Sequence, residues 1–516
     1  MEMSARRRAV GAVIALAVAG VWAAAPAGAE VDDDVAVEGT LQHVITDAEG
    51  AADDGALLTS AVEVDGALYA LPDGAAPEAP SGTEVQLDLD TDGLEPAEAL
   101  ADLNAEAPQV EVTGVTVLEA SGQLTAEGQL GVHSITVLPV RWSGVAGASV
   151  ESLRSVAQTG AAYWTEQSGG RIAMSPVDVR EYRDVPAPRS CTDSELATLY
   201  NEALKAHGDV AAPGERHHVV VYFPSWSACG WAGRATVGGG GMVWVNGAAI
   251  SDVFAHELGH NFGLGHANTM TCTGAGQRVS ITVPWSDCTT AQYGDYADVM
   301  GIAMDATTGS LNTALADSLG FAVVQQVSDG AVPLALSLEP LASVNALRSI
   351  RIPVPGGDLF IDYRPATGRD QRMATWAGVQ VHLRVTDQYG TPMTYLLDMT
   401  PSTGSAFAAP ALAVGSSWSV PSTSTTLTVL GTGQTAQLQV GAPTEPPASG
   451  DNGEMLVDSP ALTRDGRFYL RGTYSDGGAD HAFAFGNPGD TVVMGDWDGN
   501  GTRTAGVFRD GMWYLR

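Results

Sequence analysis

The segment HELGHNFGLGH, residues 256–266, places three histidines and a glutamate at spacings that suit a metal centre. His256 and His260 are four residues apart, so on a helix they share one face and can bind the same ion. Gly263 can adopt backbone conformations that other residues rarely adopt, which lets the chain turn sharply after the helix. That turn would return His266 to the metal from outside the helix.

Three neutral imidazoles leave a fourth tetrahedral position open for water, which is typical of catalytic rather than structural zinc. Zinc lowers the pKa of water towards about 7, and Glu257 follows the first histidine, where it can take a proton from that water. A plain amphipathic helix with surface histidines is the alternative, but it requires neither the glycine nor the third histidine. The segment predicts a zinc hydrolase with Glu257 as general base and acid.

Together with a second stretch at residues 296–301, this segment resembles the metzincin metallopeptidases, which have a methionine turn downstream of the zinc helix. The resemblance implies an α/β (α+β) catalytic domain in which Met300 packs beneath the metal and does not bind it. Some metzincins carry a tyrosine two residues after this methionine as a fifth ligand. That position is Ile302 here, so we expect no such ligand.

Within the metzincins, residues 293–295 ahead of the methionine turn make the chain most similar to the gametolysin family of secreted peptidases. Residues 362–364 and 394–398 also resemble the region that follows the catalytic domain in bacterial members. The resemblance implies protein or peptide substrates outside the cell. It also implies that residues 242–245 form an edge strand that pairs with extended substrate, with a flexible glycine loop as the alternative.

The four cysteines favour two disulfides, because an exported protein meets an oxidising environment. Three pairings are possible, and proximity along the chain favours Cys191 with Cys229 and Cys272 with Cys288. Binding of a metal by these cysteines is the alternative, but the chain has no C-x-x-C pair. No cysteine precedes Cys191, so the cysteine-based latency of some metzincin precursors cannot operate here.

Residues 1–29 have the pattern of a signal peptide: three arginines at 6–8, an apolar run, and small residues before position 30. An uncleaved N-terminal anchor is the alternative. No later stretch reaches the roughly 18 apolar residues that a membrane helix needs. We therefore expect a secreted, extracellular protein with no membrane attachment after cleavage of the signal.

The composition limits the remaining classes of function. The 516 residues include 25 Lys+Arg against 60 Asp+Glu, a formal net charge of −35, which argues against a nucleic-acid partner. The hydrophobic fraction of 45% is enough for packed cores, and the length predicts several domains. We expect the protein to be a monomer.

The pattern along the chain predicts an α/β catalytic domain with flanking all-β domains. Short alternating strands fill residues 30–130, which are either a propeptide or a permanent N-terminal domain. A propeptide would block the site with a carboxylate or by simple occlusion. Strands alternate with helices over residues 131–325, where a capping box at 192–195 opens one helix. Residues 326–441 read as a β-sandwich-like domain.

The C-terminal part begins with a Pro-rich linker at residues 442–455, followed by a β-repeat appendage at 456–516. Residues 464–471 recur with small changes at 509–516. Near the second copy, alternating side-chain oxygens predict a calcium loop, with a polar hairpin turn as the alternative. These oxygens belong to Asp496, Asp498 and Asn500.

Two classes of function fit the sequence. The first is a secreted zinc endopeptidase, and the second is a non-catalytic binding or adhesion protein on a metzincin scaffold. Glu257 distinguishes them, because an inactive descendant would not need it. A zinc hydrolase of another ester or amide is a third hypothesis. The pair His217 and His218, at a strand start, is interpreted as structural.

Overall fold

The computed structural model describes most of the chain outside its two ends and several loops. The described residues are 34–48, 57–91, 93–119, 129–142, 144–145, 147–274, 277–279, 288–302, 308–400, 406–441, 461–470, 479, 481–495, 504–509 and 512–515. The predicted signal peptide, the linker and the calcium candidates Asp496, Asp498 and Asn500 lie outside them. Within these ranges, no helix has the length and apolar character needed to cross a bilayer.

The region that the sequence predicts to be catalytic, named the catalytic region below after that prediction, is built on a mixed sheet with strand order β10-β11-β9-β6-β7. All neighbours in this order are parallel except β10, which is antiparallel to β11. Helices α3 and α5 pack on one face of this sheet and α4 packs on the other. The strands are β6 (Gly131–Arg141), β7 (Ile172–Val179), β8 (Arg183–Asp184), β9 (His217–Phe223), β10 (Trp231–Thr236) and β11 (Met242–Asn246); the helices are α3 (Val150–Gln167), α4 (Asp193–His207) and α5 (Ser251–Asn261).

Helices α3 and α4 begin where the sequence provides capping side chains. Ser149 precedes α3 and accepts a hydrogen bond from the amide of Ser152. Thr192 precedes α4 and accepts one from the amide of Glu195, so the predicted capping box opens this helix. Strand β9 is buried on both faces, since its alternate side chains enter the two separate cores. That burial explains its unbroken apolar run.

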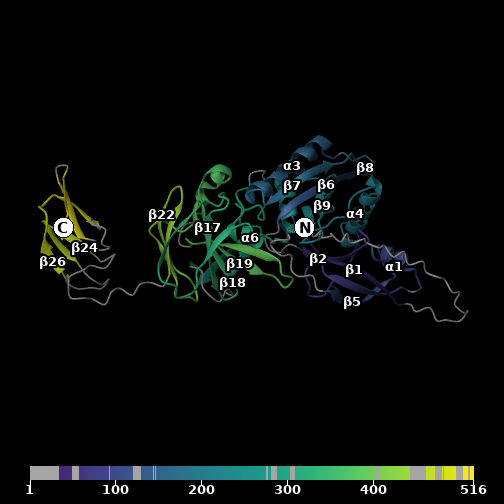
Figure 1. Ribbon diagram of the computed structural model, residues 1–516, viewed down its shortest axis with the longest axis horizontal. Helices are drawn as coiled ribbons and strands as arrows, with labels where there is room; N and C mark the ends of the chain where they lie inside the picture. Colours follow the sequence, from purple (N-terminus) through teal and green to yellow (C-terminus); the bar gives the residue numbers. More distant parts are fainter. Residues whose placement is uncertain are drawn as a thin grey trace, which may run out of the picture.

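The N-terminal region forms its own β-layer around β1, which pairs with β2 on one side and with β4 over its first half. Its core contains Leu41, Val62, Leu87 and Leu100. The second half of β1 pairs antiparallel with β10, so one sheet of eleven strands joins this region to the catalytic region (Figure 1). The elements are β1 (Asp34–Ala48), β2 (Leu57–Val64), β3 (Ala67–Ala70), β4 (Glu84–Asp90), α1 (Pro96–Leu103) and β5 (Glu111–Glu119).

The edge strand of the catalytic region differs from the prediction. Residues 242–245 belong to β11, which lies inside the sheet between β9 and β10. The edge that faces the N-terminal region is β10, and β1 is paired with it. Strand β11 is hydrogen-bonded to β9 along one edge and to β10 along the other, so its backbone has no free edge for a substrate.

The third region is a two-layer β-structure with one shared core, to which Ile361 and Val381 contribute from one sheet and Leu427 and Leu438 from the other. The first sheet takes strands from both sides of residue 325, because β12 pairs parallel with β20. The first sheet contains β12 (Ala267–Gly274), β13 (Gln277–Val279), β14 (Cys288–Ala291), β15 (Val323–Gln326), β17 (Leu347–Val354), β18 (Gly357–Arg364), β19 (Gly378–Thr386) and β20 (Pro392–Leu397); the second contains β16 (Leu334–Leu338), β21 (Ser417–Ser419), β22 (Thr426–Thr432) and β23 (Ala436–Gly441).

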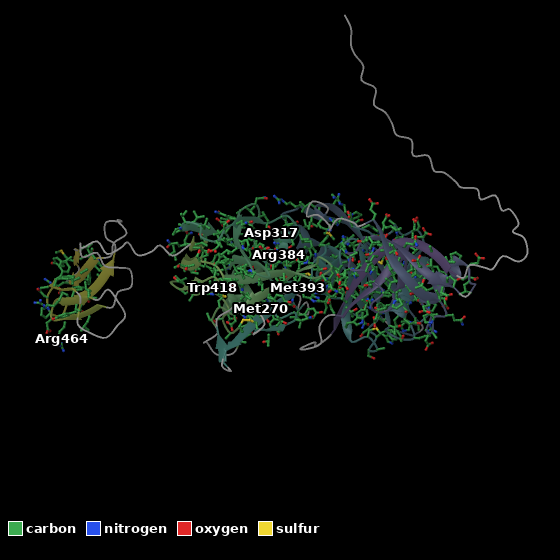
Figure 2. The ribbon with its side chains drawn as sticks, turned by 90° about the horizontal axis from the view of Figure 1, so that it is seen from below. Met270, Asp317, Arg384, Met393, Trp418 and Arg464 are labelled. Carbon is green, nitrogen blue, oxygen red and sulfur yellow. A yellow bond between two sulfur atoms is a disulfide. The ribbon has the colours of Figure 1, made fainter. Side chains whose placement is uncertain are left out.

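Two further elements connect the catalytic and third regions. Helix α6 (Thr313–Ser318) packs against the first sheet, and Asp317 at its end forms an ion pair with Arg384 of β19 at 2.8 Å (Figure 2). A 3₁₀ segment, η2 (Gly368–Trp376), follows β18 and brings the buried Asp370 beneath the methionine turn.

The C-terminal residues form two three-stranded antiparallel sheets. The first copy of the repeat forms the hairpin of β24 and β25, whose turn residues Asp465 and Gly466 both have positive φ. The second copy forms the corresponding pair of β28 and β29. The strands are β24 (Ala461–Arg464), β25 (Arg467–Leu470), β26 (His481–Ala484), β27 (Thr491–Gly495), β28 (Thr504–Arg509) and β29 (Met512–Leu515).

The four cysteines form two disulfides, Cys191–Cys229 and Cys272–Cys288. This is the pairing that proximity along the chain favours. None of the four thiols is therefore left to bind a metal. The described fold as a whole is mostly β, with few helices and mixed sheets.

Candidate metal and active site

Helix α5 carries the first two histidines and is buried along almost its whole length. It packs across α3, where Gly160 leaves room for Phe254 and where the Trp164 indole donates a hydrogen bond to the Ala255 carbonyl at 2.9 Å. The helix ends at residue 261, and Gly263 then turns the chain with φ of +87°. The glycine therefore has the turning role that the sequence assigned to it.

This turn brings His266 against the two helical histidines. The Nε2 atoms of His266 and His260 lie 3.2 Å apart. The Nδ1 atoms of His256 and His260 face the carbonyls of Val299 and Leu264, each at 2.7 Å. A carbonyl can only accept, so both Nδ1 atoms carry a proton. In the neutral form of each ring, Nε2 then presents a lone pair to the centre of the cluster.

A fourth side chain, Asp47 of β1, enters the same cluster. Its Oδ1 lies 3.0 Å from His266 Nε2 and 3.6 Å from His260 Nε2, and its Oδ2 lies 3.2 Å from His256 Nε2. The ligand atoms of these four residues all lie within 4.8 Å of one another. The register between β1 and β10 shifts between Thr46 and Ala48, at Asp47. Such irregularities redirect side chains next to functional sites.

The cluster fits a tetrahedral zinc ion. Zinc–nitrogen bonds of about 2.0–2.1 Å in a tetrahedron put two nitrogens roughly 3.3–3.4 Å apart. The separation of 3.2 Å between His260 and His266 is close to that value. His256 Nε2 and Glu257 Oε2 are also buried without a hydrogen-bond partner among the described residues, as atoms that face an ion or its water would be. The three histidines could thus hold a zinc ion, with Asp47 as the fourth ligand.

Burial sets the charge of these groups. It lowers the pKa of His266 to about 4 despite the nearby Asp47 carboxylate, so this imidazole is neutral at neutral pH. Burial also raises the pKa of Glu257 well above its usual range, and the charge of Asp47 adds to this effect. For Asp47 burial acts in the opposite direction, but the nearby histidines, His256 foremost, hold its pKa well below the usual range.

The side chain of Glu257 lies between α5 and β10, next to Asp47, and Gly233 of β10 leaves room for it. A methyl group at Gly233 would overlap Oε1 of Glu257. Only glycine fits where another group approaches a strand this closely. The side chain of Glu257 is 1% exposed, so the described structure shields it from water while β1 is in place.

The methionine turn lies below the metal cluster. Met300 is fully buried and its sulfur contacts the helix at Gly259, where a methyl group would overlap it. The turn also supplies the Val299 carbonyl that orients His256. The carbonyl of Met300 accepts a hydrogen bond from the amide of Ala267 at 2.8 Å. Met300 is not among the four possible ligands, and its role as the floor of the site remains a prediction. Ile302 is about half exposed and is not one of them either.

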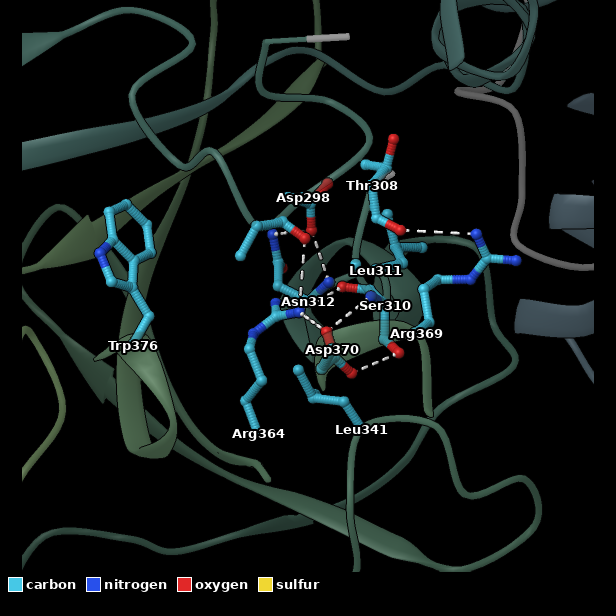
Figure 3. Close-up of polar contacts among 12 residues, drawn as sticks. Asp298, Thr308, Ser310, Leu311, Asn312, Leu341, Arg364, Arg369, Asp370 and Trp376 are labelled. Atoms are coloured by element: carbon cyan, nitrogen blue, oxygen red, sulfur yellow. Dashed lines mark hydrogen bonds and ion pairs between the residues drawn. The ribbon is translucent and has the colours of Figure 1, made fainter. Parts of the chain in front are cut away.

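A buried polar network supports this turn from the side of the third region (Figure 3). Asp298 Oδ2 accepts hydrogen bonds from the amide and side chain of Asn312 at 2.6 and 3.0 Å. Next to it, Asp370 binds Arg364 Nη1 at 2.5 Å and the Ser310 hydroxyl at 2.8 Å. Arg364 is completely buried, so removal of one partner would leave an uncompensated charge.

His382 of β19 is a second buried charged group between the third region and the segment before the methionine turn. It lies 3.2 Å from Asp295 and 3.4 Å from Asp362, with all three side chains fully buried. Burial alone would lower the pKa of His382, but the two carboxylates raise it to about 9. The imidazole is therefore a cation at neutral pH and joins β19 to the segment before the methionine turn.

Two groups at the site could not be found by reading the sequence. Asp47 is one of 60 acidic residues and lies far from the histidines along the chain, so no local pattern selects it. Tyr293 lies closer, just before the methionine turn, and its hydroxyl is 2.9 Å from Asp47 Oδ1. The available signal for Tyr293 was only its place beside that turn.

The pair at residues 217–218 is structural, as interpreted. His218 lies 3.1 Å from His133 and 3.0 Å from Asn261 Oδ1, inside the core beside helix α5. Burial lowers the pKa of His218 to about 3, so it is neutral. His217 contacts the Ser134 hydroxyl at 2.7 Å.

Comparison with known proteins points in the same direction. Residues 206–279, which contain the complete histidine segment, match the family described as Peptidase M66. No curated relative matches the chain. A solved structure similar to part of it is metalloproteinase-II from Bacteroides fragilis, at 10% identity, with 54% of this chain and 90% of that chain covered and a TM-score of 0.24. The family match supports a peptidase, and the cluster of three histidines and Asp47 is a possible metal site for it.

Proposed function

We propose that this protein is a secreted zinc endopeptidase that hydrolyses extracellular proteins or peptides and is made in a latent form. The observation that carries the proposal is the convergence of three buried histidines, Glu257 and a paired edge strand at one place. The match of residues 206–279 to a peptidase family supports it independently of the geometry. The two disulfides fit a protein that works outside the cell.

The substrate would bind as an extended strand along β10. Strand β1 shows that this edge accepts an antiparallel partner, since Val44 pairs with Thr236 and Thr46 with Arg234. Main-chain hydrogen bonds of this kind hold a peptide whatever its side chains are. A peptide in this place would put its scissile carbonyl where the Asp47 carboxylate now lies, beside Glu257 and the histidines.

Glu257 would move the protons of the reaction. A zinc ion held by the three histidines would polarise the scissile carbonyl and lower the pKa of the water. Glu257 accepts one proton while the water oxygen bonds to the carbonyl carbon and the C=O π electrons move to the carbonyl oxygen. The electrons on the carbonyl oxygen then re-form the C=O bond, the C–N bond breaks, and Glu257 gives its proton to the leaving nitrogen. The second proton of the water, left on the new carboxyl group, also passes to the amine, so the products are a carboxylate and an ammonium group.

Residues 30–130 would be the inhibitory propeptide, with Asp47 as the blocking carboxylate. Its oxygens face all three histidines, and its strand covers the edge that a substrate needs. A carboxylate therefore takes the place that a cysteine takes in other latent metzincins. Activation would require withdrawal of β1 from β10, which proteolysis between the two regions would permit.

The test compares the secreted protein with its Glu257→Gln variant. We expect both to contain about one zinc per chain, and only the wild type to cleave a denatured protein mixture after the N-terminal region is removed. A chelator should abolish the cleavage, and zinc should restore it. If both proteins hold zinc and neither cleaves any peptide, the cluster is a scaffold and the adhesion hypothesis replaces this one.

A further inference from the structure

Tyr293 is held at the metal cluster by its backbone and its ring. It lies between β14 and the methionine turn with φ of +55°, a left-handed conformation that is uncommon for a residue other than glycine. Its amide donates a hydrogen bond to Asn268 Oδ1 at 3.0 Å. Its ring centroid is 4.0 Å from that of His266 and 6.2 Å from that of His256.

The hydroxyl of Tyr293 is directed at the same oxygen that the metal cluster faces. Asp47 Oδ1 lies 2.9 Å from this hydroxyl and 3.0 Å from His266 Nε2. An ionised carboxylate accepts hydrogen bonds and cannot donate them, so the tyrosine is the donor. The site therefore holds a proton donor aimed at a negatively charged oxygen beside the metal position.

Asp47 indicates where the charge of the reaction develops. It belongs to a strand that pairs with β10 as an extended peptide would, and under the proposed function its oxygen lies where the scissile carbonyl oxygen would lie. When water adds to the carbonyl carbon, this oxygen becomes an oxyanion. A donor already in place stabilises it most, because the donor needs no reorganisation during the reaction.

We propose that Tyr293 is a catalytic residue whose hydroxyl donates a hydrogen bond to the substrate oxyanion. The inference rests on the proposed peptidase function and extends it. Position 302, two residues after Met300, is an isoleucine and has no polar atom that could make this hydrogen bond. Tyr293, which precedes Met300, would supply the hydrogen bond instead. In the latent chain the same hydroxyl binds Asp47, and in the active enzyme it binds the substrate.

The experiment compares Tyr293→Phe with Tyr296→Phe in the secreted protein. If residues 30–130 are still attached after secretion, limited proteolysis removes them first. Tyr296 is the matched control, because it is a tyrosine only three residues further along the chain but is 53% exposed. We measure kcat and KM for a peptide, zinc content, the melting temperature, and the affinity of a phosphinic peptide, whose tetrahedral phosphorus carries the oxyanion.

We expect Tyr293→Phe to lower kcat by about 10²–10³-fold with little change in KM, as for the loss of one oxyanion donor. The affinity of the phosphinic peptide should fall by a similar factor, while zinc content and melting temperature stay at the wild-type values. Tyr296→Phe should change none of these quantities.

Other results would overturn the assignment. If Tyr293→Phe speeds release of the N-terminal region but leaves kcat of the processed enzyme unchanged, the hydroxyl serves only latency. Loss of zinc or a lower melting temperature would make Tyr293 a structural residue of the turn. If the zinc-loaded wild type binds the phosphinic peptide but cleaves nothing, the proposed function fails, and the affinity comparison still decides the role of Tyr293. A wild type that neither cleaves nor binds overturns both.

Discussion

Replacement of Asp47 by asparagine should weaken the block on the active site while leaving the size of the side chain unchanged. The carboxylate is 15% exposed and makes two short contacts, to Tyr293 at 2.9 Å and to His266 at 3.0 Å. In the zinc-loaded chain His266 Nε2 would bind the metal, so only the Tyr293 contact counts as a hydrogen bond, and a hydrogen bond to a charged group contributes about 1.5–3 kcal/mol. Since about 1.4 kcal/mol changes an equilibrium tenfold, separation of β1 from β10 should become about 10–10²-fold more frequent.

Hydrogen exchange measures that separation directly. The amides in and next to β10 that donate to β1, such as the amide of Val237, which donates to the His43 carbonyl at 2.8 Å, exchange when the two strands part. The comparison uses zinc-loaded chains that also carry Glu257→Gln, so that no chain can process itself. Glu38→Gln is the matched control, because it removes one charge from an exposed position of the same strand.

We expect the exchange of these amides to accelerate in the Asp47 variant and to stay unchanged in the Glu38 variant. In the parent background with Glu257 intact, the unprocessed Asp47→Asn chain should cleave a fluorogenic peptide faster than the unprocessed wild type. Unchanged exchange together with unchanged cleavage would refute the reasoning. The strand pairing alone, without the carboxylate, would then account for latency.

Two further predictions concern the rest of the site. Gly233→Ala should reduce peptide cleavage at least about 10²-fold without loss of zinc, because the added methyl group displaces the Glu257 carboxylate. The check is to measure cleavage kinetics and zinc content of the variant. Near-normal activity would contradict the prediction. His382 has a pKa raised from 6.5 to about 9, so its contribution to stability is full below pH 6.5 and is lost as the pH rises through 9. The loss is about 3 kcal/mol, measured by denaturant unfolding at pH 6 and pH 9.5, and His382→Asn should flatten that dependence.

The local part of the site could be predicted from the sequence because its geometry is helical. The spacing of His256 and His260 fixes their common face, and Gly263 is needed for the return of His266. Capping side chains at Ser149 and Thr192 likewise set the starts of two helices. In each case the residues that determine the structure lie within a few turns of one another.

The nonlocal part could not be predicted in the same way. Which strand forms the edge of the sheet depends on a pairing between β10 and β1, whose partners are almost 200 residues apart, as Val44 and Thr236 are. The sequence nevertheless contained one warning. Residues 242–245 are wholly apolar, a composition typical of a strand buried on both faces and unsuited to an edge. Asp47 had no such signal, because acidic residues are common throughout the N-terminal region.

The third region belongs to the scaffold of the site and is more than an attached module. The chain leaves His266 directly into β12, which pairs with β20, and the amide of Thr394 donates to the His266 carbonyl at 3.1 Å. The amide of Gly265 donates to the Pro392 carbonyl at 2.9 Å. The third histidine is thus held between the turn after α5 on one side and β20 on the other. Because a metal centre tolerates little displacement of its ligands, the position of His266 depends on both regions folding together.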